Sequence, residues 1–139
     1  IMLVEYLKKI YQNFTRENGS ASAISKIGFR TKLRDVVVDL NDAVPIGLIF
    51  NEILTILYQL VDKLSDNFCN FVSLKWQNTN NLMFTVRFHN EVVELLKEKF
   101  ESSAEKASLT DLLEQVDGYM ESHFDKSELK LIVKLSKIN

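Results

Sequence analysis

Residues 44–63 read VPIGLIFNEILTILYQLVDK, and the interpretation of the whole chain depends on them. A proline and a glycine stand near the start, and the apolar run that follows predicts a helix that continues to about Lys63. Asn51 and Glu52 form its one polar pair. Together with Gln59 they interrupt the run, so the segment is not predicted to insert into a membrane. The pattern fits either the wall of a ligand site or a core helix.

The residues before this stretch predict where the helix begins. Asp39 and Asn41 have side chains that commonly cap helix N-termini, and Pro45 follows them. A proline is tolerated in the first turn because the N–H groups there have no partner within the helix. We therefore expect Pro45 in the first turn.

The rest of the chain alternates between period-2 and helical patterns. The predicted elements are helices at 2–16, 91–107 and 109–116, the last capped by Ser108, and strands at 23–30, 33–38, 67–78, 81–90, 119–124 and 128–136. The last two pairs of strands are joined by short polar turns, which indicate hairpins. The sequence therefore predicts an α+β fold, a two-layer α/β sandwich with helices on one face of a mostly antiparallel sheet.

Length and composition limit the classes of protein. A chain of 139 residues with 46% hydrophobic residues fits a single domain, 1–139, and its first residue, Ile rather than Met, suggests a fragment of a longer chain. The net charge is −2 and no basic block occurs, so nucleic acid is not an expected partner. Cys69 is the only cysteine, which excludes an internal disulfide and favours a reducing, cytoplasmic setting.

Residues 40–55, LNDAVPIGLIFNEILT, resemble the N-box region of the ATP-binding domain of bacterial sensor histidine kinases. The agreement covers Leu40, Asp42 loosely, Ala43, Pro45, Gly47, Leu48, Ile49, Asn51, Glu52 and Ile53. Residues 4–14, 81–90 and 108–122 are similar to the first helix, the central strand and the closing helix and strand of the same family. The likeness also extends to histidine phosphotransfer proteins with decayed ATPase domains. It implies the Bergerat-type sandwich of histidine kinase ATPase domains.

The resemblance implies a magnesium site that this sequence does not complete. In the family, the N-box helix presents a glutamate and, one turn later, an asparagine whose side-chain oxygen holds the magnesium ion that bridges the triphosphate. Glu52 matches the glutamate, but the residue one turn later is Ile56, and a hydrocarbon cannot ligate a cation that requires oxygen. The Lys-His pair of the family pattern corresponds to Leu60 and Val61, so the phosphate-facing charge is missing too.

The adenine and lid elements of the family are also replaced. Phe88 stands where the family has the aspartate that accepts a hydrogen bond from adenine, and phenylalanine accepts none. His89 to Val92 stand where the family has Asn-Gly-x-Gly. No glycine occurs between Asn90 and Asp117, so the glycine-rich lid that cradles phosphates is absent from the sequence.

These replacements predict a pseudo-ATPase domain. The vestigial nucleotide-site positions are Asn51, Glu52, Ile56, Phe88 and Asn90. We expect Ile56, Leu57, Leu60 and Phe88 to fill the volume that polar groups occupy in the family. No catalytic, cofactor-binding or metal-binding residue is predicted.

Other residues that often carry chemistry have simpler interpretations here. His89 and His123 lie at predicted strand ends and are expected to be ordinary surface histidines. Cys69 falls in a predicted strand and is expected to be a small buried hydrophobic residue. The aromatic Trp76 and Tyr119 more often close a sheet than form an interface. Asn51 is expected to brace a loop, with Glu52 partly exposed. The first helix, which carries Tyr6 and Tyr11, is expected to pack in the core. The resemblance leaves a contact role as the second interpretation, because in the family the segment before this helix joins the dimerising phosphoacceptor helices.

Three functional hypotheses follow. The first is a non-catalytic two-component signalling module that acts through protein contacts or phosphotransfer regulation; the resemblance implies as partners a response regulator, a histidine kinase or a second copy of the chain. The second is a divergent but active ATP-binding domain that uses Glu52 with Asn90 or Thr55 as substitute magnesium ligands. The third is a ligand-sensing domain that uses the old nucleotide cleft for another small molecule, which a large apolar pocket would support.

Overall fold

The helix predicted at 44–63 is the longest element of the structure, a computed structural model that describes residues 1–17, 27–61, 70–89, 93–102 and 104–135. This helix, α3, spans Leu40–Val61. It begins before Pro45 because the carbonyl of Asp39 accepts hydrogen bonds from the N–H groups of Asp42 and Ala43. Pro45 therefore lies in the second turn, and its predicted place in the first turn is wrong. The predicted end at Lys63 lies outside the described residues.

The sheet has the order β1-β2-β3-β5-β4. Its strands are β1 (Ile27–Thr31), β2 (Asn70–Trp76), β3 (Asn81–Arg87), β4 (Tyr119–His123) and β5 (Glu128–Lys134). β1 runs parallel to β2, and the other three pairings are antiparallel, which confirms the mostly antiparallel sheet. Both predicted hairpins form; the short helix η2 (Phe124–Lys126) lies in the second.

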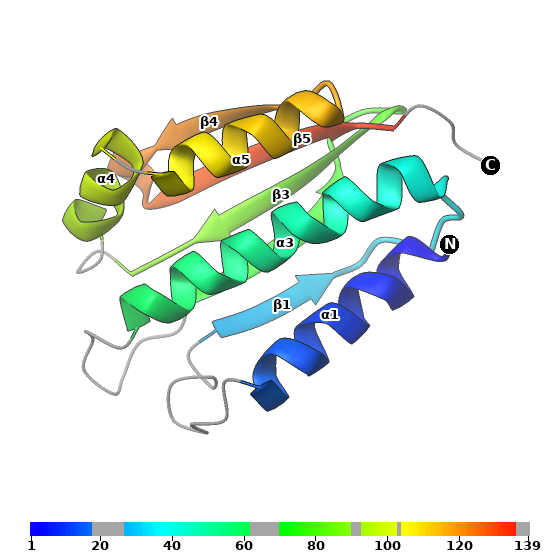
Figure 1. The fold of residues 1–139 in the computed structure, drawn as a ribbon, viewed down its shortest axis with the longest axis horizontal. Helices are drawn as coiled ribbons and strands as arrows, with labels where there is room; N and C mark the ends of the chain where they lie inside the picture. Colours follow the sequence, from blue (N-terminus) through cyan, green and yellow to red (C-terminus); the bar gives the residue numbers. More distant parts are fainter. Residues whose placement is uncertain (18–26, 62–69, 90–92, 103, 136–139) are drawn as a thin grey trace.

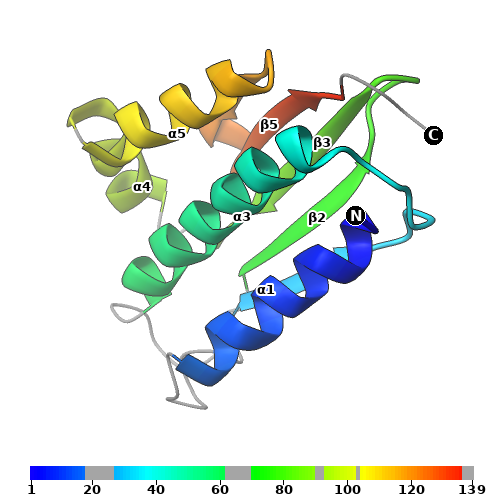
Figure 2. The same cartoon turned by 45° about the vertical axis from the view of Figure 1, so that its right-hand side comes forward.

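The helices form one layer over one face of this sheet (Figures 1 and 2). They are α1 (Leu3–Glu17), α3, α4 (Val93–Ser102) and α5 (Ala104–Gln115). Both views place α3 between α1 and α5. The core lies between the layers: Phe50 of α3 stacks on Phe84 of β3 at 5.7 Å between ring centres, and Phe29 of β1 lies 4.6 Å from Phe50. The predicted two-layer sandwich is confirmed.

The apolar character of α3 comes from this central position. By length and composition, residues 40–60 resemble a helix that crosses a membrane. Most of the side chains in this stretch are buried inside the protein, however, as in the core helix of a sandwich. Burial within the sandwich therefore accounts for this composition.

The strand predicted at 33–38 does not form. Only Val37 makes an isolated bridge, to Met2. The segment instead holds the first turn of α1, because the Asp35 carboxylate accepts from the N–H groups of Val4 at 2.7 Å and Glu5 at 3.2 Å. N–H groups in the first turn of a helix have no partner within the helix, so the Asp35 carboxylate caps them. These bonds hold the segment 33–38 against α1 in place of pairing within the sheet.

The helix break predicted at Ser108 is also misplaced. α5 already begins at Ala104 and includes Ser108. The residues before Ser108 are Ala104 to Ala107, AEKA, which are strong helix formers. Leu109 and Leu113 are buried on the same helix, so packing of the longer helix prevails over the capping preference of serine.

The turn from α5 into β4 depends on Gly118. A Cβ atom at this position would collide with the backbone carbonyl oxygen of Ile132. We expect Gly118→Ala to lower the free energy of unfolding by roughly 1–3 kcal/mol, because backbone must move to accept the methyl group. Gly28→Ala is the matched control, since its Cβ atom would meet only Phe71 at 3.5 Å, an ordinary contact. Urea denaturation of both variants tests this; equal losses would contradict it.

Candidate functional site

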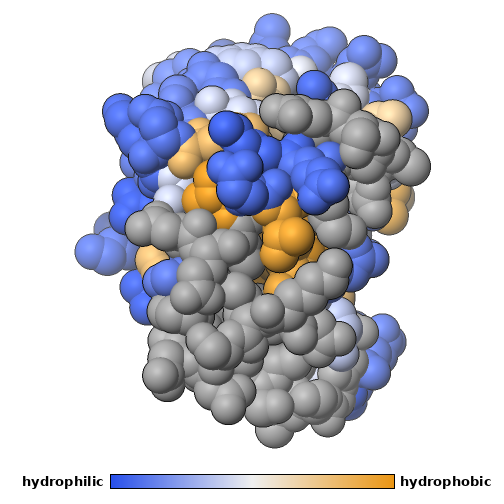
Figure 3. Space-filling model, turned by 90° about the vertical axis from the view of Figure 1, so that its left-hand side faces the viewer, coloured by the Kyte–Doolittle hydropathy of each residue, from blue (hydrophilic) through white to orange (hydrophobic). Residues whose placement is uncertain are grey.

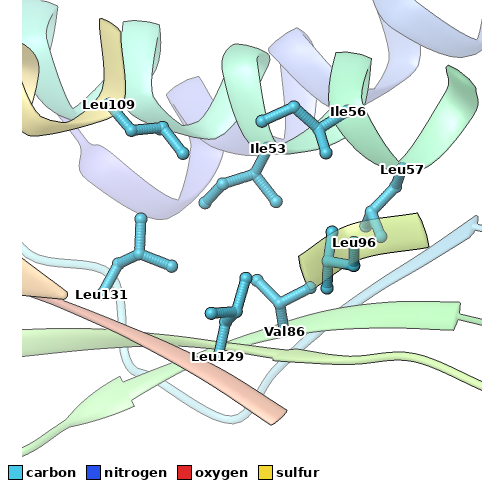
Figure 4. Close-up of a pocket in the computed structure, with 8 residues that line it drawn as sticks. All are labelled: Ile53, Ile56, Leu57, Val86, Leu96, Leu109, Leu129 and Leu131. Carbon is cyan, nitrogen blue, oxygen red and sulfur yellow. The ribbon is translucent and has the colours of Figure 1, made fainter. Parts of the chain in front are cut away.

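An aliphatic cavity lies between the helices and the sheet. Its lining consists of Ile53, Ile56, Leu57, Val86, Leu96, Leu109, Leu129 and Leu131, and its volume is about 10 Å³. Figure 4 shows these side chains pointing toward one another from α3, α4, α5, β3 and β5. Such a volume is about that of one water-sized probe, and the lining offers no polar side chain to hold a water. The aliphatic side chains that line the cavity therefore leave little free volume between them.

The helix residues predicted to fill the family's nucleotide site lie in this region or beside it. Ile56 is 3% exposed and Leu57 1%, and both line the cavity. Leu60, one turn later, is also buried. A charged or amide side chain at these positions would have only aliphatic neighbours in the cavity, at a cost of several kcal/mol for an unpaired charge.

The polar pair of α3 does not reach the cavity. Asn51 is exposed and Glu52 half-buried, and neither lines the aliphatic space. The Asn51 backbone carbonyl accepts a hydrogen bond from the Thr55 hydroxyl at 2.9 Å, a contact within one helical turn. The expected partial exposure of Glu52 is confirmed. No described contact links the Asn51 side chain to a loop.

Phe88 lies just beyond the end of β3. It is 6% exposed and packs against Phe124 of η2 at 6.3 Å between ring centres. Its N–H donates to the carbonyl of Ser127 at 3.2 Å, which fixes the end of β3 against the β4–β5 turn. Phe88 is thus buried as predicted, although it does not line the cavity. Asn90 lies outside the described residues.

Neither of the two histidines lines the aliphatic cavity. His123 is half-buried at the end of β4, where its Nε2 atom lies 3.3 Å from a carboxylate oxygen of Glu121. His89 is half-buried beyond β3. Among the described residues, no group of three or more His, Cys, Asp or Glu side chains is arranged to hold a metal ion. Cys69 lies outside the described residues.

The aromatic residues of α1 have structural roles. The Tyr11 hydroxyl donates to the carbonyl of Ile27 in β1 at 2.6 Å. Tyr6 packs on Gly47, where a Cβ atom would lie 2.5 Å from the Tyr6 hydroxyl oxygen, so the glycine permits a close approach of α1 and α3. Trp76 packs against the core, whereas Tyr119 is 47% exposed.

Several exposed apolar side chains lie near the start of α3. Leu40, Val44 and Leu48 recur every four residues, which places them on one face of the helix. They are 60%, 43% and 50% exposed. Figure 3 shows a second area of hydrophobic surface next to hydrophilic side chains, at the end of the molecule where α4 lies.

Sequence reasoning missed part of the cavity wall. Leu96 and Leu109 come from α4 and α5, and Leu129 and Leu131 from β5. Leu96 lies in the helix predicted at 91–107, Leu109 in the helix predicted at 109–116, and Leu129 and Leu131 in the strand predicted at 128–136. None of these patterns shows that the apolar faces meet over Ile56. That juxtaposition is a tertiary property.

Solved structures of histidine kinases share this fold. The blue-light activated histidine kinase of Erythrobacter litoralis EL346 matches with a TM-score of 0.66 and 18% identity over 99% of this chain and 46% of that chain. The Acinetobacter baumannii histidine kinase AdeS matches with a TM-score of 0.66 and 9% identity over 99% of this chain and 66% of that chain. The mycobacterial sensor histidine kinase MprB matches with a TM-score of 0.57 and 12% identity over 97% and 94%.

These likenesses confirm the predicted fold, that of the ATPase-type domains of histidine kinases. The chain spans about half of the length of the blue-light activated kinase. No family model and no curated protein matches the sequence.

Proposed function

We propose that this chain is a two-component signalling module whose ATPase-like domain has lost nucleotide binding and acts through protein contacts or phosphotransfer regulation. The observation that carries the proposal is the aliphatic cavity around Ile56. In the resembling family, the asparagine corresponding to Ile56 holds magnesium. Here that position faces leucine and valine side chains, which supply no oxygen to a cation and no donor to a phosphate.

The proposed setting is the cytoplasm, and the proposed partners are a histidine kinase, a response regulator or a second copy of the chain. The likeness to histidine kinases supports this class of partner. The exposed Leu40, Val44 and Leu48 support a function through protein contacts, because apolar side chains grouped on a surface often mark interaction sites.

Neither alternative hypothesis gains a favourable observation. The divergent-kinase hypothesis needs Glu52 with Asn90 or Thr55 as magnesium ligands. Asn90 lies outside the described residues, neither Glu52 nor Thr55 lines the cavity, and the Thr55 hydroxyl donates to the Asn51 carbonyl. The ligand-sensing hypothesis needs a large apolar pocket in the old nucleotide cleft. The aliphatic cavity of about 10 Å³ is far below the roughly 300 Å³ of a small ligand site.

Thermal unfolding with nucleotide tests the proposal. We expect the melting temperature to stay unchanged with millimolar ATP or ADP, with and without magnesium. A ligand that binds the folded state at a hundred times its Kd stabilises it by about 2.7 kcal/mol, which raises the melting temperature by several degrees. A rise of that size that requires magnesium would overturn the proposal and favour the divergent kinase.

A further inference from the structure

A basic groove lies beside β1, an edge strand of the sheet. It is lined by residues 29–31 of β1, by Lys32 just beyond the end of that strand, by residues 73–75 of β2 and by Lys8 of α1, and has a volume of about 600 Å³. This volume lies within the range of ligand sites, roughly 300–1,000 Å³. The groove shares no lining residue with the aliphatic cavity, so it is a separate feature of the molecule.

The charge of the groove has one sign. Four cationic side chains line it, Lys8, Arg30, Lys32 and Lys75, and no carboxylate does. None of the four forms an ion pair within the described part of the chain. The Arg30 guanidinium carbon lies 4.5 Å from the centre of the Phe71 ring, a cation–π contact that restrains it on the sheet.

Two acidic side chains, Glu5 and Asp35, line a neighbouring hollow together with Lys8, and both have other partners. Glu5 forms an ion pair with Lys9 at 3.7 Å. The Asp35 carboxylate accepts from two N–H groups at the start of α1. Neither residue lines the groove, so its positive charge is left for a ligand from outside the described chain.

The edge strand beside the groove offers backbone groups as well as charge. In the part of the chain that the structure describes, β1 is paired on one side only, with β2. In such a strand, alternate residues direct their N–H and C=O groups away from the paired neighbour. At the start of β1, the carbonyl of Ile27 accepts a hydrogen bond from the Tyr11 hydroxyl. The groove lies beside the later residues, Phe29 to Thr31.

We propose that the groove binds an extended acidic segment of a partner protein, which adds as a strand to the free edge of β1. Its backbone bonds to the edge, and its carboxylates, which lie on one face of the added strand, contact Lys32 and Lys75. Strand addition draws affinity from main-chain hydrogen bonds and specificity from alternate side chains, and the cations supply that specificity here. The inference does not depend on the loss of nucleotide binding.

The test is fluorescence anisotropy with a labelled peptide of alternating Glu and Val, about six residues long, the usual length of a strand. At physiological ionic strength we expect saturable binding that weakens about tenfold or more in the double variant Lys32→Glu/Lys75→Glu, through lost attraction and new repulsion. The control Lys106→Glu/Lys126→Glu changes the net charge equally at exposed positions outside the groove and is expected to bind like the parent. Thermal melts confirm that each variant is folded.

A second probe separates strand addition from charge attraction without changing the protein. The same peptide with alternate backbone nitrogens methylated keeps its charge but loses the N–H groups that face the edge, so it is expected not to bind. The proposal fails if the parent peptide does not bind, or if the methylated peptide or a single-stranded oligonucleotide of equal charge binds as tightly. It also fails if the control reversal weakens binding equally. Each of these results leaves the nucleotide experiment unaffected.

Discussion

Phe84→Ala is expected to lower the free energy of unfolding by roughly 3–5 kcal/mol, the usual cost of deleting a buried aromatic ring. Phe84 is 0% exposed and its ring lies 10° from parallel to that of Phe50, which joins β3 to α3. The cavity left behind would lie at the centre of the sandwich, where the helix and the sheet cannot easily collapse. Thermal and urea denaturation measure the loss, which for a domain of this size corresponds to more than about 10 °C.

Tyr119→Ala provides the control for this prediction. Tyr119 is also an aromatic residue of the sheet, but it is 47% exposed and its hydroxyl accepts from Gln77 at 3.3 Å between exposed side chains. Its loss is expected to cost less than about 1 kcal/mol. Similar losses in the two variants would contradict the assignment of the core to the Phe50–Phe84 layer.

Ile56→Asn restores the residue type of the resembling family, and we expect it to destabilise the domain without restoring nucleotide binding. Ile56 is 3% exposed among aliphatic side chains, so the amide would lose hydrophobic burial and find no hydrogen-bond partner in the cavity lining. Together these effects cost roughly 2–5 kcal/mol. Urea denaturation gives the stability, and titration with magnesium ATP gives the binding.

Leu48→Asn places the same amide on the same helix at a position that is 50% exposed. It is expected to change stability by about 0.5 kcal/mol or less, since water solvates the amide. If Ile56→Asn were equally mild, the cavity would have to contain polar partners or water. If it gained magnesium-dependent ATP binding, one substitution would have separated this domain from an active one.

Much of the fold could be predicted because its elements have clear periodicity. The apolar run of α3, the alternation in β3 and β5, and the asparagine-rich turn between β2 and β3 each define an element from local residues. The strand predicted at 33–38 is wrong because valine favours strands, whereas Asp35 within this segment caps α1, thirty residues away along the chain.

The site could be predicted only in part. The resemblance implies that Ile56, one helical turn after Glu52, stands where the family has a magnesium ligand. That Leu96 and Leu109 complete the hydrocarbon wall depends on how α4 and α5 pack over α3, which spacing along the chain does not specify. The basic groove joins side chains from α1, β1 and β2 and depends in the same way on tertiary packing.

Methyl NMR of the protein titrated with magnesium ATP tests the central claim, that the former nucleotide site is filled with hydrocarbon. The methyl groups of Ile53, Ile56 and Leu96 line the cavity and report directly on any ligand that enters beside them. We predict that their chemical shifts stay unchanged at millimolar nucleotide. Saturable shifts of these methyl groups that require magnesium would contradict the claim and show that the domain still binds ATP.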